Sequence, residues 1–426
     1  MTIVHFSTVT QDGAGSFAVN VHKSILGLRM PSLFISRTSE LFTSRTPDDF
    51  RNLFVVKPFN RLETKARVIR NYIFSKFGFI DSKYALFGVE TSPVTSSHLE
   101  AILNKSDITA FIFYWTSYFV DFDTIYTLKQ KFPSAQFLFV LVDEAFLTGG
   151  CHYTYGCNQY QDSCGRCPAT SLTQLRNRIQ ANLASKIGKI HAIDPLVIYP
   201  STLLSEMGEK SAVFANARSS VLPFGALSRL ELEANRTRLS EIGDQQKPKT
   251  EKIKILVRSS TEYRKGCDLF LSAIRMLHAE IPNLRRKLEI ISVGDDAISQ
   301  SDMSLYIDHT DLGIVSRSVL LSVYGEVDAL LISSREDSGP LMLNESVAMG
   351  VFVISTPVGV ARDLITSERV GTITSEISDK AIKLAILGFL SKGRLDGARK
   401  VHDGMDKLTF EGFSDSLLAL IKDDQI

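Results

Sequence analysis

One stretch near the C-terminal end constrains the fold most, because it reads as a complete strand–helix–strand unit. Residues 329–333 are short, apolar and bounded by polar residues, which is typical of a buried parallel strand. Pro340 suits the first turn of a helix, where its missing N–H would have no partner anyway. Gly350 ends this helix, and a second apolar strand follows at 351–354. The pattern predicts an α/β protein with parallel strands.

The loop and the helix start in this stretch are suited to bind a phosphate. Free backbone amides and the positive end of the helix dipole favour an anion, and Gly339 lets a ligand approach the backbone. Asp337 and Glu345 add two carboxylates with seven residues between them. Carboxylates beside a phosphate site usually accept hydrogen bonds from sugar hydroxyls. The alternative is an acidic helix start on a surface loop, which needs no ligand.

The same stretch resembles the E-x7-E region of retaining glycosyltransferases of family four, which are two-domain enzymes of the GT-B fold. The resemblance implies that Glu345 holds the donor ribose and that the first acidic position lies at the donor sugar. It also implies that the amides between them meet the sugar or the phosphate. This chain has Asp337, preceded by Glu336, where the family has Glu. Which of these two carboxylates meets the donor sugar stays open.

The chain opens with strand, glycine-containing loop, helix and strand. The loop at 11–16 contains Gly13 and Gly15, and the helix at 17–28 leads to a strand at 33–35. This order is typical of a Rossmann-like domain, although the two glycines do not complete a dinucleotide fingerprint. In GT-B enzymes the equivalent loop faces the donor diphosphate, so the resemblance implies that both glycines contact the donor.

A chain of 426 residues is too long for one typical core and suits two domains. The polar run at 236–251 predicts a linker between an acceptor-side domain at 1–235 and a donor domain at 252–405. The last helix of GT-B proteins often returns to the first domain, which we expect of residues 406–426. The expected architecture is GT-B, with two Rossmann-like domains facing a central cleft.

A basic turn after the first strand of the second half suits a diphosphate. A cation at the mouth of a strand–helix loop pairs with phosphate oxygens. The family's KG signature falls on Lys265, whereas its Arg position is Ser260, so Arg258 or Arg264 would have to substitute. A solvated basic turn is the alternative. Residues 312–315 resemble the family's LG-x-V motif, whose backbone usually meets the nucleobase. The donor contacts that the resemblance implies in this half are Arg258, Arg264, Lys265, Leu312, Ile314, Gly339, Leu341, Met342 and Glu345.

Four of the five cysteines fall within one insertion at 148–168, and they are Cys151, Cys157, Cys164 and Cys167. In a cytosolic protein, thiols this close predict a structural zinc site, because zinc prefers a tetrahedron of thiolates and needs no oxidising compartment. Two disulfides or free thiols are the alternatives, and His152 could replace one thiol. The block resembles TGGCHY…CGxCP in a subgroup of family-four enzymes. No catalytic cofactor is implied.

The strand before this insertion departs from that subgroup. That subgroup usually has His–Asp at the end of this strand, with the His facing the donor sugar, and this chain has Val142–Asp143. Valine neither donates nor accepts a hydrogen bond. Either Asp143, Glu144 or His152 takes the role, or the donor lacks the hydroxyl normally held, or catalysis is weak or lost.

Composition restricts the partners and the location. The net charge of +1 argues against a general nucleic-acid binder, which would be markedly basic. The sequence contains neither an apolar run of 18 residues nor a leader pattern, so we expect a cytoplasmic protein. Residues 51–80 interleave basic and aromatic side chains. This indicates either peripheral contact with the inner face of a membrane, near a lipid-linked acceptor, or a solvated basic helix with its aromatics packed inward.

Together the motifs predict a hexosyltransferase that moves a sugar from a nucleotide-diphosphate donor to a hydroxyl of a glycan, lipid-linked or small-molecule acceptor, with retention. No enzyme nucleophile is evident, and the family mechanism leaves positioning and charge stabilisation to the protein. The candidate catalytic residues are Asp337, Glu336, Lys265 and Asp143. The rivals are a non-catalytic GT-B protein that binds a nucleotide or a partner, suggested by Val142 and Asp337, and a sugar-nucleotide epimerase on fold analogy.

Overall fold

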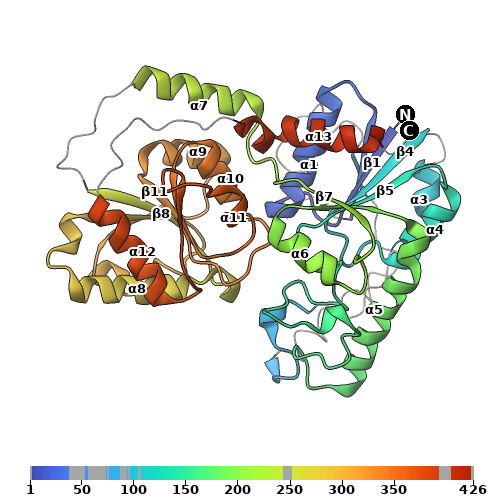
Figure 1. Cartoon of the computed structure of the whole chain (residues 1–426), viewed down its shortest axis with the longest axis horizontal. Helices are drawn as coiled ribbons and strands as arrows, with labels where there is room; N and C mark the ends of the chain where they lie inside the picture. Colours follow the sequence, from blue (N-terminus) through green and yellow to red (C-terminus); the bar gives the residue numbers. More distant parts are fainter. Residues whose placement is uncertain are drawn as a thin grey trace. The chain divides into compact units, whose positions relative to one another are not determined.

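The computed structural model describes residues 2–37, 53–55, 73, 76–86, 94, 96–103, 107–242, 252–392 and 404–423. The chain forms two compact units. Unit 1 comprises Met1–Pro223 and Phe413–Ile426, and unit 2 comprises Phe224–Gly412. Figure 1 shows both units and labels most of their helices and several of their strands. In the described part of the chain, no helix is both long and apolar enough to cross a membrane.

Unit 1 is built on a parallel sheet whose described strands follow the order β3-β2-β1-β4-β5-β6-β7. Its interior is rich in phenylalanine, and the rings of Phe6 and Phe113 stack at 5.1 Å. Such aromatic packing supplies much of the apolar area buried in a core. The strands are β1 (Thr2–Ser7), β2 (Ser32–Ser36), β3 (Leu53–Val55), β4 (Ile108–Phe113), β5 (Gln136–Val140), β6 (Leu196–Tyr199) and β7 (Arg218–Val221).

The helices of unit 1 connect these strands, as parallel pairing requires. They are α1 (Asp12–Gly27), α3 (Ser96–Leu103), α4 (Phe122–Lys131), α5 (Thr173–Ile193) and α6 (Thr202–Lys210). The end of the chain returns to this unit in α13 (Phe410–Asp423), where Phe413 meets Phe17 of α1 edge-to-face at 5.0 Å.

Unit 2 repeats this plan with the strand order β10-β9-β8-β11-β12-β13, again all parallel among the described pairs. Its strands are β8 (Ile253–Ser259), β9 (Leu288–Gly294), β10 (Asp308–Asp311), β11 (Ala329–Ile332), β12 (Phe352–Ser355) and β13 (Gly371–Ile373). Its helices are α7 (Arg229–Ile242), α8 (Cys267–Glu280), α9 (Arg317–Glu326), α10 (Leu341–Ala348), α11 (Ala361–Leu364) and α12 (Asp379–Lys392).

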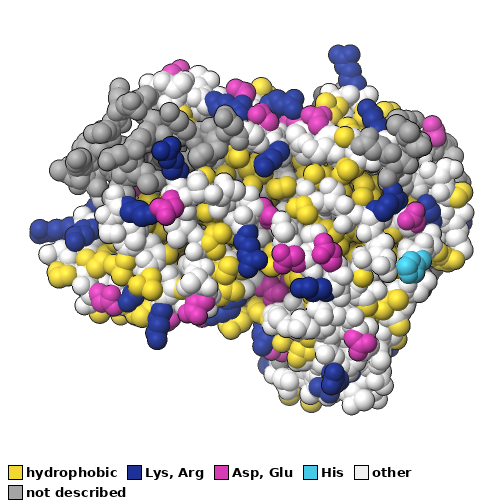
Figure 2. Space-filling model, viewed as in Figure 1, with side chains coloured by type: hydrophobic (Ala, Val, Ile, Leu, Met, Phe, Trp, Pro, Cys, Tyr) yellow, Lys and Arg dark blue, Asp and Glu magenta, His cyan; other side chains and the backbone are white. Residues whose placement is uncertain are grey.

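Both sheets follow the Rossmann order, in which the chain first builds outward in one direction and then in the other. The order reverses between β1 and β4 in unit 1 and between β8 and β11 in unit 2. The strand–helix–strand unit predicted at 329–354 is β11, α10 and β12, with Pro340 directly before α10 and Gly350 after it at a φ of +69°. Figure 2 shows acidic and basic side chains interspersed, in keeping with the net charge of +1.

The predicted loop at 11–16 is wrong. Helix α1 starts at Asp12, so Gly13 and Gly15 lie in its first turn. A Cβ atom on Gly15 would lie 2.7 Å from the carbonyl oxygen of Val9, so this position needs glycine for close packing of the helix start. Gly13 has no such constraint, since a Cβ atom there would meet no other atom within 4 Å.

The structure also differs from the predicted linker. Residues 236–242 continue α7, 243–251 lie outside the described residues, and the units divide at Pro223 and Phe224. Helix α7 is anchored on unit 2 by Leu232, which is buried in its core, and Arg236 at the start of the polar run pairs with Asp406 at 3.1 Å. The predicted membrane contact falls on residues 51–80, most of which lie outside the described residues.

Candidate functional site

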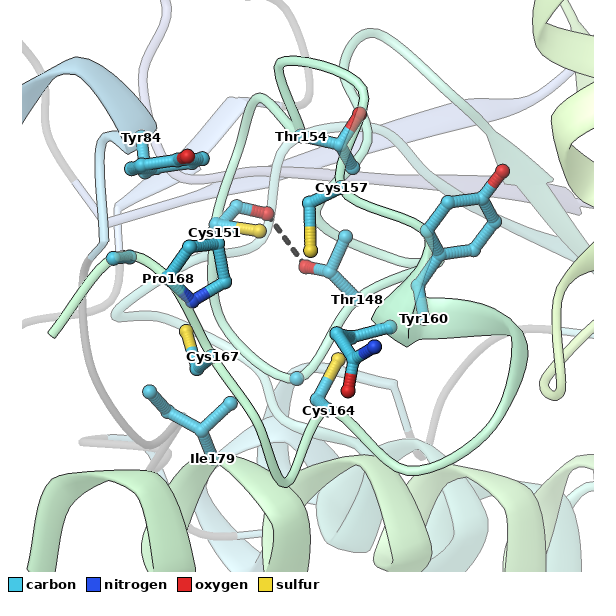
Figure 3. Close-up of a pocket in the computed structure, with 13 residues that line it drawn as sticks. Tyr84, Thr148, Cys151, Thr154, Cys157, Tyr160, Cys164, Cys167, Pro168 and Ile179 are labelled. Atoms are coloured by element: carbon cyan, nitrogen blue, oxygen red, sulfur yellow. Dashed lines mark hydrogen bonds between the residues drawn. The ribbon is translucent and has the colours of Figure 1, made fainter. Parts of the chain in front are cut away.

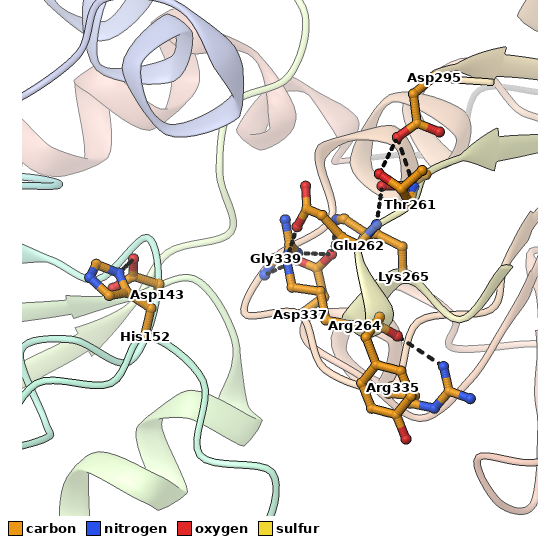
Figure 4. Close-up of polar contacts among 12 residues, drawn as sticks. Asp143, His152, Thr261, Glu262, Arg264, Lys265, Asp295, Arg335, Asp337 and Gly339 are labelled. Carbon is orange, nitrogen blue, oxygen red and sulfur yellow. Dashed lines mark hydrogen bonds and ion pairs between the residues drawn. The ribbon is translucent and has the colours of Figure 1, made fainter. Parts of the chain in front are cut away.

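Charged side chains gather in unit 2 at the point where β8 and β11 end (Figure 4). These adjacent strands flank the reversal in strand order. In open α/β sheets, ligands bind beyond the carboxyl ends of the strands at this place. Lys265 closes the 3-10 turn η5 (Tyr263–Lys265) that follows β8, and Asp337 lies in the loop between β11 and α10. The topology therefore brings two predicted site residues to one edge of the sheet.

The two loops are held against each other by their backbones. The amide of Arg335 donates to the carbonyl oxygen of Arg264 at 2.7 Å, and the Ser333 hydroxyl donates to the carbonyl oxygen of Lys265 at 2.9 Å. Gly266 has a φ of +65°, and a Cβ atom there would lie 2.0 Å from the Ser333 carbonyl oxygen. Only glycine fits both the backbone conformation and the space. These contacts between the loops fix the position of the Lys265 backbone.

Asp337 is paired with two cations. Its Oδ2 lies 2.5 Å from Lys265 Nζ and 3.4 Å from Arg264 Nη1, and its Oδ1 accepts from the Gly339 amide at 3.3 Å. Burial opposes ionisation of Asp337, but the charges of Lys265 and Arg264 outweigh it and hold the pKa of this carboxyl below its ordinary value. Burial lowers the pKa of Lys265, and the attraction of Asp337 offsets part of that effect.

The cations of this cluster are matched by carboxylates. Arg264 also pairs with Glu262, whose Oε2 lies 2.6 Å from Arg264 Nε. Two positive and two negative side chains therefore face one another, with Lys265 and Asp337 both mostly buried. An incoming anion would have to take the place of a carboxylate beside Lys265. The charges of the four side chains therefore balance one another.

Glu345 occupies a different environment on α10. Its Oε2 accepts from the Tyr324 hydroxyl at 2.6 Å, and its Oε1 lies 3.0 Å from Arg317 Nη1. Burial raises the pKa of Glu345, and Arg317 and the Tyr324 hydroxyl offset only part of this rise. Each oxygen keeps one lone pair for a further donor. Glu345 is therefore a buried acceptor that is already oriented.

The remaining donor residues predicted in unit 2 are spread around this edge. Arg264 contacts Asp337, whereas Arg258 lies exposed on β8, so Arg264 is the arginine joined to the cluster. Glu336 is half-buried, and its amide approaches the Arg264 carbonyl oxygen at 3.4 Å. In α10 Leu341 is half-buried and Met342 is buried, while Leu312 and Ile314 are exposed in the loop after β10.

In unit 1 a histidine–aspartate pair lies beyond the ends of two neighbouring strands, β4 and β5 (Figure 4). His152 Nδ1 lies 2.5 Å from Asp143 Oδ2, and Asp143 Oδ1 accepts from the Ala145 amide at 2.9 Å. His152 Nε2 lies 3.1 Å from the Ser117 hydroxyl. All three side chains are buried near the ends of β4 and β5. Asp143 thus orients His152, while Val142, directly before Asp143, is half-buried.

Glu144, the third side chain considered for the missing histidine's role, is engaged elsewhere. Its Oε2 accepts from the Thr154 amide at 2.7 Å, which fixes the start of the cysteine-rich insertion. The other predicted donor contacts of unit 1, Gly13 and Gly15, lie at the start of α1. Of the three side chains predicted to take the histidine role, His152 is the one that supplies an imidazole, and the Asp143 carboxylate holds that ring beyond the ends of the strands.

The four clustered cysteines line one pocket (Figure 3). All four are free thiols, so the disulfide alternative is absent from this structure. Burial raises the pKa of the Cys151 thiol, and it raises the pKa of the Cys164 thiol to about 11. Among the described residues, no three Cys, His, Asp or Glu side chains stand in an arrangement that could hold a metal ion.

Zinc in this pocket stays a prediction of the sequence. Elemental analysis of protein purified without added metal should find about one zinc per chain if four thiolates share an ion. Four titratable thiols without metal would remove the prediction. Because thiolate ligands must lose their protons, zinc occupancy should also fall on acidification.

Sequence reasoning missed Arg317, Tyr324 and Glu231. Arg317 joins Glu345 to Glu231, whose Oε1 lies 2.8 Å from Arg317 Nε, although Arg317 and Glu231 are 86 positions apart. No local pattern marks such a pair. The apolar spacing of α9 could have indicated Tyr324 as a buried side chain, but not its partner.

The fold is that of GT-B glycosyltransferases. A glycosyltransferase from Rickettsia africae ESF-5 is similar with a TM-score of 0.62 and 15% identity, over 99% of this chain and 98% of that chain. Anabaena Alr3699/HepE, solved in complex with UDP-glucose, is similar with a TM-score of 0.56 and 12% identity, over 99% of this chain and 100% of that chain. The likeness confirms the predicted class of two Rossmann-like domains.

Sequence comparison adds the class of enzyme. Residues 240–400 match the family described as "Glycosyl transferases group 1". A putative colanic acid biosynthesis glycosyl transferase, WcaC, from Escherichia coli (strain K12) is 23% identical over 297 residues, which are 66% of this chain and 68% of that protein. These matches support a glycosyltransferase. The family match falls within unit 2, which carries Lys265, Asp337 and Glu345.

Proposed function

We propose that this chain transfers a hexosyl group from a nucleoside-diphosphate sugar to a hydroxyl of a glycan, lipid-linked or small-molecule acceptor, with retention at the anomeric carbon, in glycoconjugate biosynthesis. One observation carries the proposal: Lys265 and Arg264 meet Asp337 where the strand order of unit 2 reverses. Buried cations at this place suit a diphosphate, and acidic side chains suit the hydroxyls of a sugar.

Lys265 and Arg264 would hold the diphosphate and stabilise its charge as it leaves. The amides at the start of α10 add partial positive charge. When the diphosphate takes the cations, Asp337 is released from its pair and can accept a hydrogen bond from the donor sugar. Glu336 is the neighbouring alternative for that contact.

The transfer breaks the bond between the anomeric carbon and the phosphate oxygen, and it forms a bond from the acceptor oxygen on the same face. The acceptor proton passes to the leaving phosphate oxygen, so no protein nucleophile is required. The part of this chain is to position both substrates and to stabilise the charge of the leaving group. Glu345 would fix the donor by accepting from its ribose.

We further propose that His152 serves the role of the family histidine that Val142 replaces. Its pairing with Asp143 at 2.5 Å fixes the ring, and Nε2 faces the Ser117 hydroxyl. Asp143→Asn would leave the ring less well oriented, so turnover should fall while diphosphate binding stays unchanged. His191→Gln, on the exposed side of α5, is the matched control.

Calorimetry with UDP, GDP, ADP and TDP tests the proposal. UDP comes first because Alr3699/HepE was solved with UDP-glucose. Binding of one diphosphate, followed by turnover of its sugar derivatives, would establish the donor. Binding without turnover would favour the non-catalytic alternative that Val142 suggests. Donor conversion without an acceptor would favour an epimerase, and no binding at all would overturn the proposal.

A further inference from the structure

We infer that Arg317 is a positioning residue that fixes the Glu345 carboxylate as an acceptor for the two hydroxyls of a nucleotide ribose. This inference rests on the proposed function, because it assumes that a nucleoside diphosphate occupies unit 2. It assigns a role to a side chain that sequence motifs do not mark. The contacts that carry it lie within unit 2.

The guanidinium of Arg317 is shared between two carboxylates. Nη1 faces Glu345 Oε1 at 3.0 Å, whereas Nε and Nη2 face the two oxygens of Glu231 at 2.8 and 3.0 Å. This is the bidentate geometry that arginine offers and lysine does not. Glu231 therefore fixes the plane of the guanidinium, which leaves the Nη1 amino group to hold Glu345.

Further contacts keep Arg317 from moving. Nη2 also donates to the carbonyl oxygen of Ala226, and the guanidinium carbon lies 5.7 Å from the centre of the Phe410 ring. Arg317 is the first residue of α9, Glu231 lies on α7, and Glu345 lies on α10. One side chain thus joins three helices, so its position is set by tertiary packing rather than by its own rotamer preference.

The charges explain why Glu345 needs this partner. A buried carboxylate without a cation takes up a proton, and its protonated oxygen then donates instead of accepting. Arg317 is shared with Glu231, so the three side chains carry one net negative charge. Tyr324 supplies a neutral hydrogen bond to Oε2 at 2.6 Å. The lone pairs that remain on Glu345 suit a ligand with neighbouring hydroxyl donors, and a ribose diol is such a ligand.

The test is calorimetry on the full chain with Arg317→Met. The probes are whichever of the ribonucleotides UDP, GDP and ADP binds best, its 2′,3′-dideoxy analogue, and inorganic pyrophosphate. We expect Arg317→Met to weaken the ribonucleotide by about 10- to 100-fold, since hydrogen bonds to a charged group are lost. The dideoxy analogue and pyrophosphate should change by less than about 3-fold. Arg286→Met, on an exposed arginine of the same unit, is the control.

Two further variants keep the test decisive. Arg317→Lys retains the charge without the fork and should fall between wild type and Arg317→Met. In the double variant with Glu345→Gln, Arg317→Met should add nothing to the loss from Glu345→Gln, because it acts through that carboxylate. Unchanged pyrophosphate binding would show that unit 2 is folded.

The possible outcomes distinguish a failure of the Arg317 role from a failure of the proposed function. Equal weakening of the ribonucleotide and its dideoxy analogue, or no weakening of either, would overturn the role of Arg317 while the proposed function stands. If wild type binds none of the four diphosphates, the proposed function falls and the inference falls with it.

Discussion

Asp337 and Glu345 are separated by seven residues, yet their surroundings have opposite effects on their charge. Asp337 faces Lys265 and Arg264, and these cations lower the pKa of Asp337 in spite of its burial. Glu345 shares its one cation with Glu231, and burial raises the pKa of Glu345. The balance of nearby cations therefore decides the state of each carboxyl group.

Under the proposed function, the difference suits the two carboxylates to different tasks. Asp337 stands in for an anion beside cations that a diphosphate would use, so it acts as a counter-ion in the ligand-free protein. Glu345 is held by a tyrosine and an arginine as a fixed acceptor. The family pattern treats them as two ends of one motif, whereas the proposed function gives exchange of charge to Asp337 and recognition of hydroxyls to Glu345.

The largest effect should come from Lys265→Met, which removes the closest cation from Asp337. Loss of one preorganised group that stabilises the leaving charge should lower turnover by about 100- to 1,000-fold. Steady-state kinetics with the identified donor would measure this, and Lys287→Met, an exposed lysine of the same unit, is the control. Equal turnover of Lys265→Met and wild type would show that Asp337 and Lys265 form only a structural pair.

Glu345→Gln should have the next largest effect, and on binding rather than on charge stabilisation. We expect a ribonucleoside diphosphate to bind about 10- to 100-fold more weakly, since charge-assisted hydrogen bonds to ribose are replaced by neutral ones. Pyrophosphate should bind as before. Glu326→Gln, an exposed position on α9, controls for the substitution itself. Parallel losses for nucleotide and pyrophosphate would break the comparison, because Glu345 would then serve the phosphates as well.

Asp337→Asn should produce a smaller change of opposite sign. Removing the internal counter-ion frees Lys265, so pyrophosphate should bind more tightly, by about 5-fold for a gain near 1 kcal/mol. Sugar transfer should fall, because the donor sugar loses its acceptor. Asp302→Asn, in the exposed pair with Arg275, is the matched control for loss of an ion pair. Weaker pyrophosphate binding by Asp337→Asn would contradict the counter-ion role.

The smallest effect is a difference in how the two variants respond to pH. The folded-state pKa of Asp337 is lowered, so its charge stabilises the fold above about pH 4 and this is lost as pH falls through the folded pKa. The folded-state pKa of Glu345 is raised, so protonated Glu345 favours the fold below about pH 4 and this is lost as pH rises through the folded pKa.

Urea unfolding between pH 2.5 and 8 would check these signs. Relative to wild type, Asp337→Asn should become less stable as pH rises toward about 4 and then change little. Glu345→Gln should become more stable only as pH rises above about 4. Curves that move together, with both changes on the same side of pH 4, would mean that the two carboxyl groups share one environment.

Local patterns in the sequence were enough to predict much of the fold. Alternation of short apolar runs with helical spacing predicted β11, α10 and β12, and the second strand–helix repeat predicted a second Rossmann-like unit. The same local reasoning misplaced the start of α1 and the division between the units. Gly15 was assigned to a loop because its packing against Val9 is not visible in the local pattern.

The sequence by itself determined the class of fold and the residue types that suit a diphosphate and a sugar. Only the tertiary structure decided which of them meet. Lys265 and Asp337 are 72 positions apart, and Arg317 and Glu231 are 86 apart. Secondary structure follows from patterns within a few residues, whereas ion pairs and pKa values depend on burial and on charges that only the folded sheet brings together.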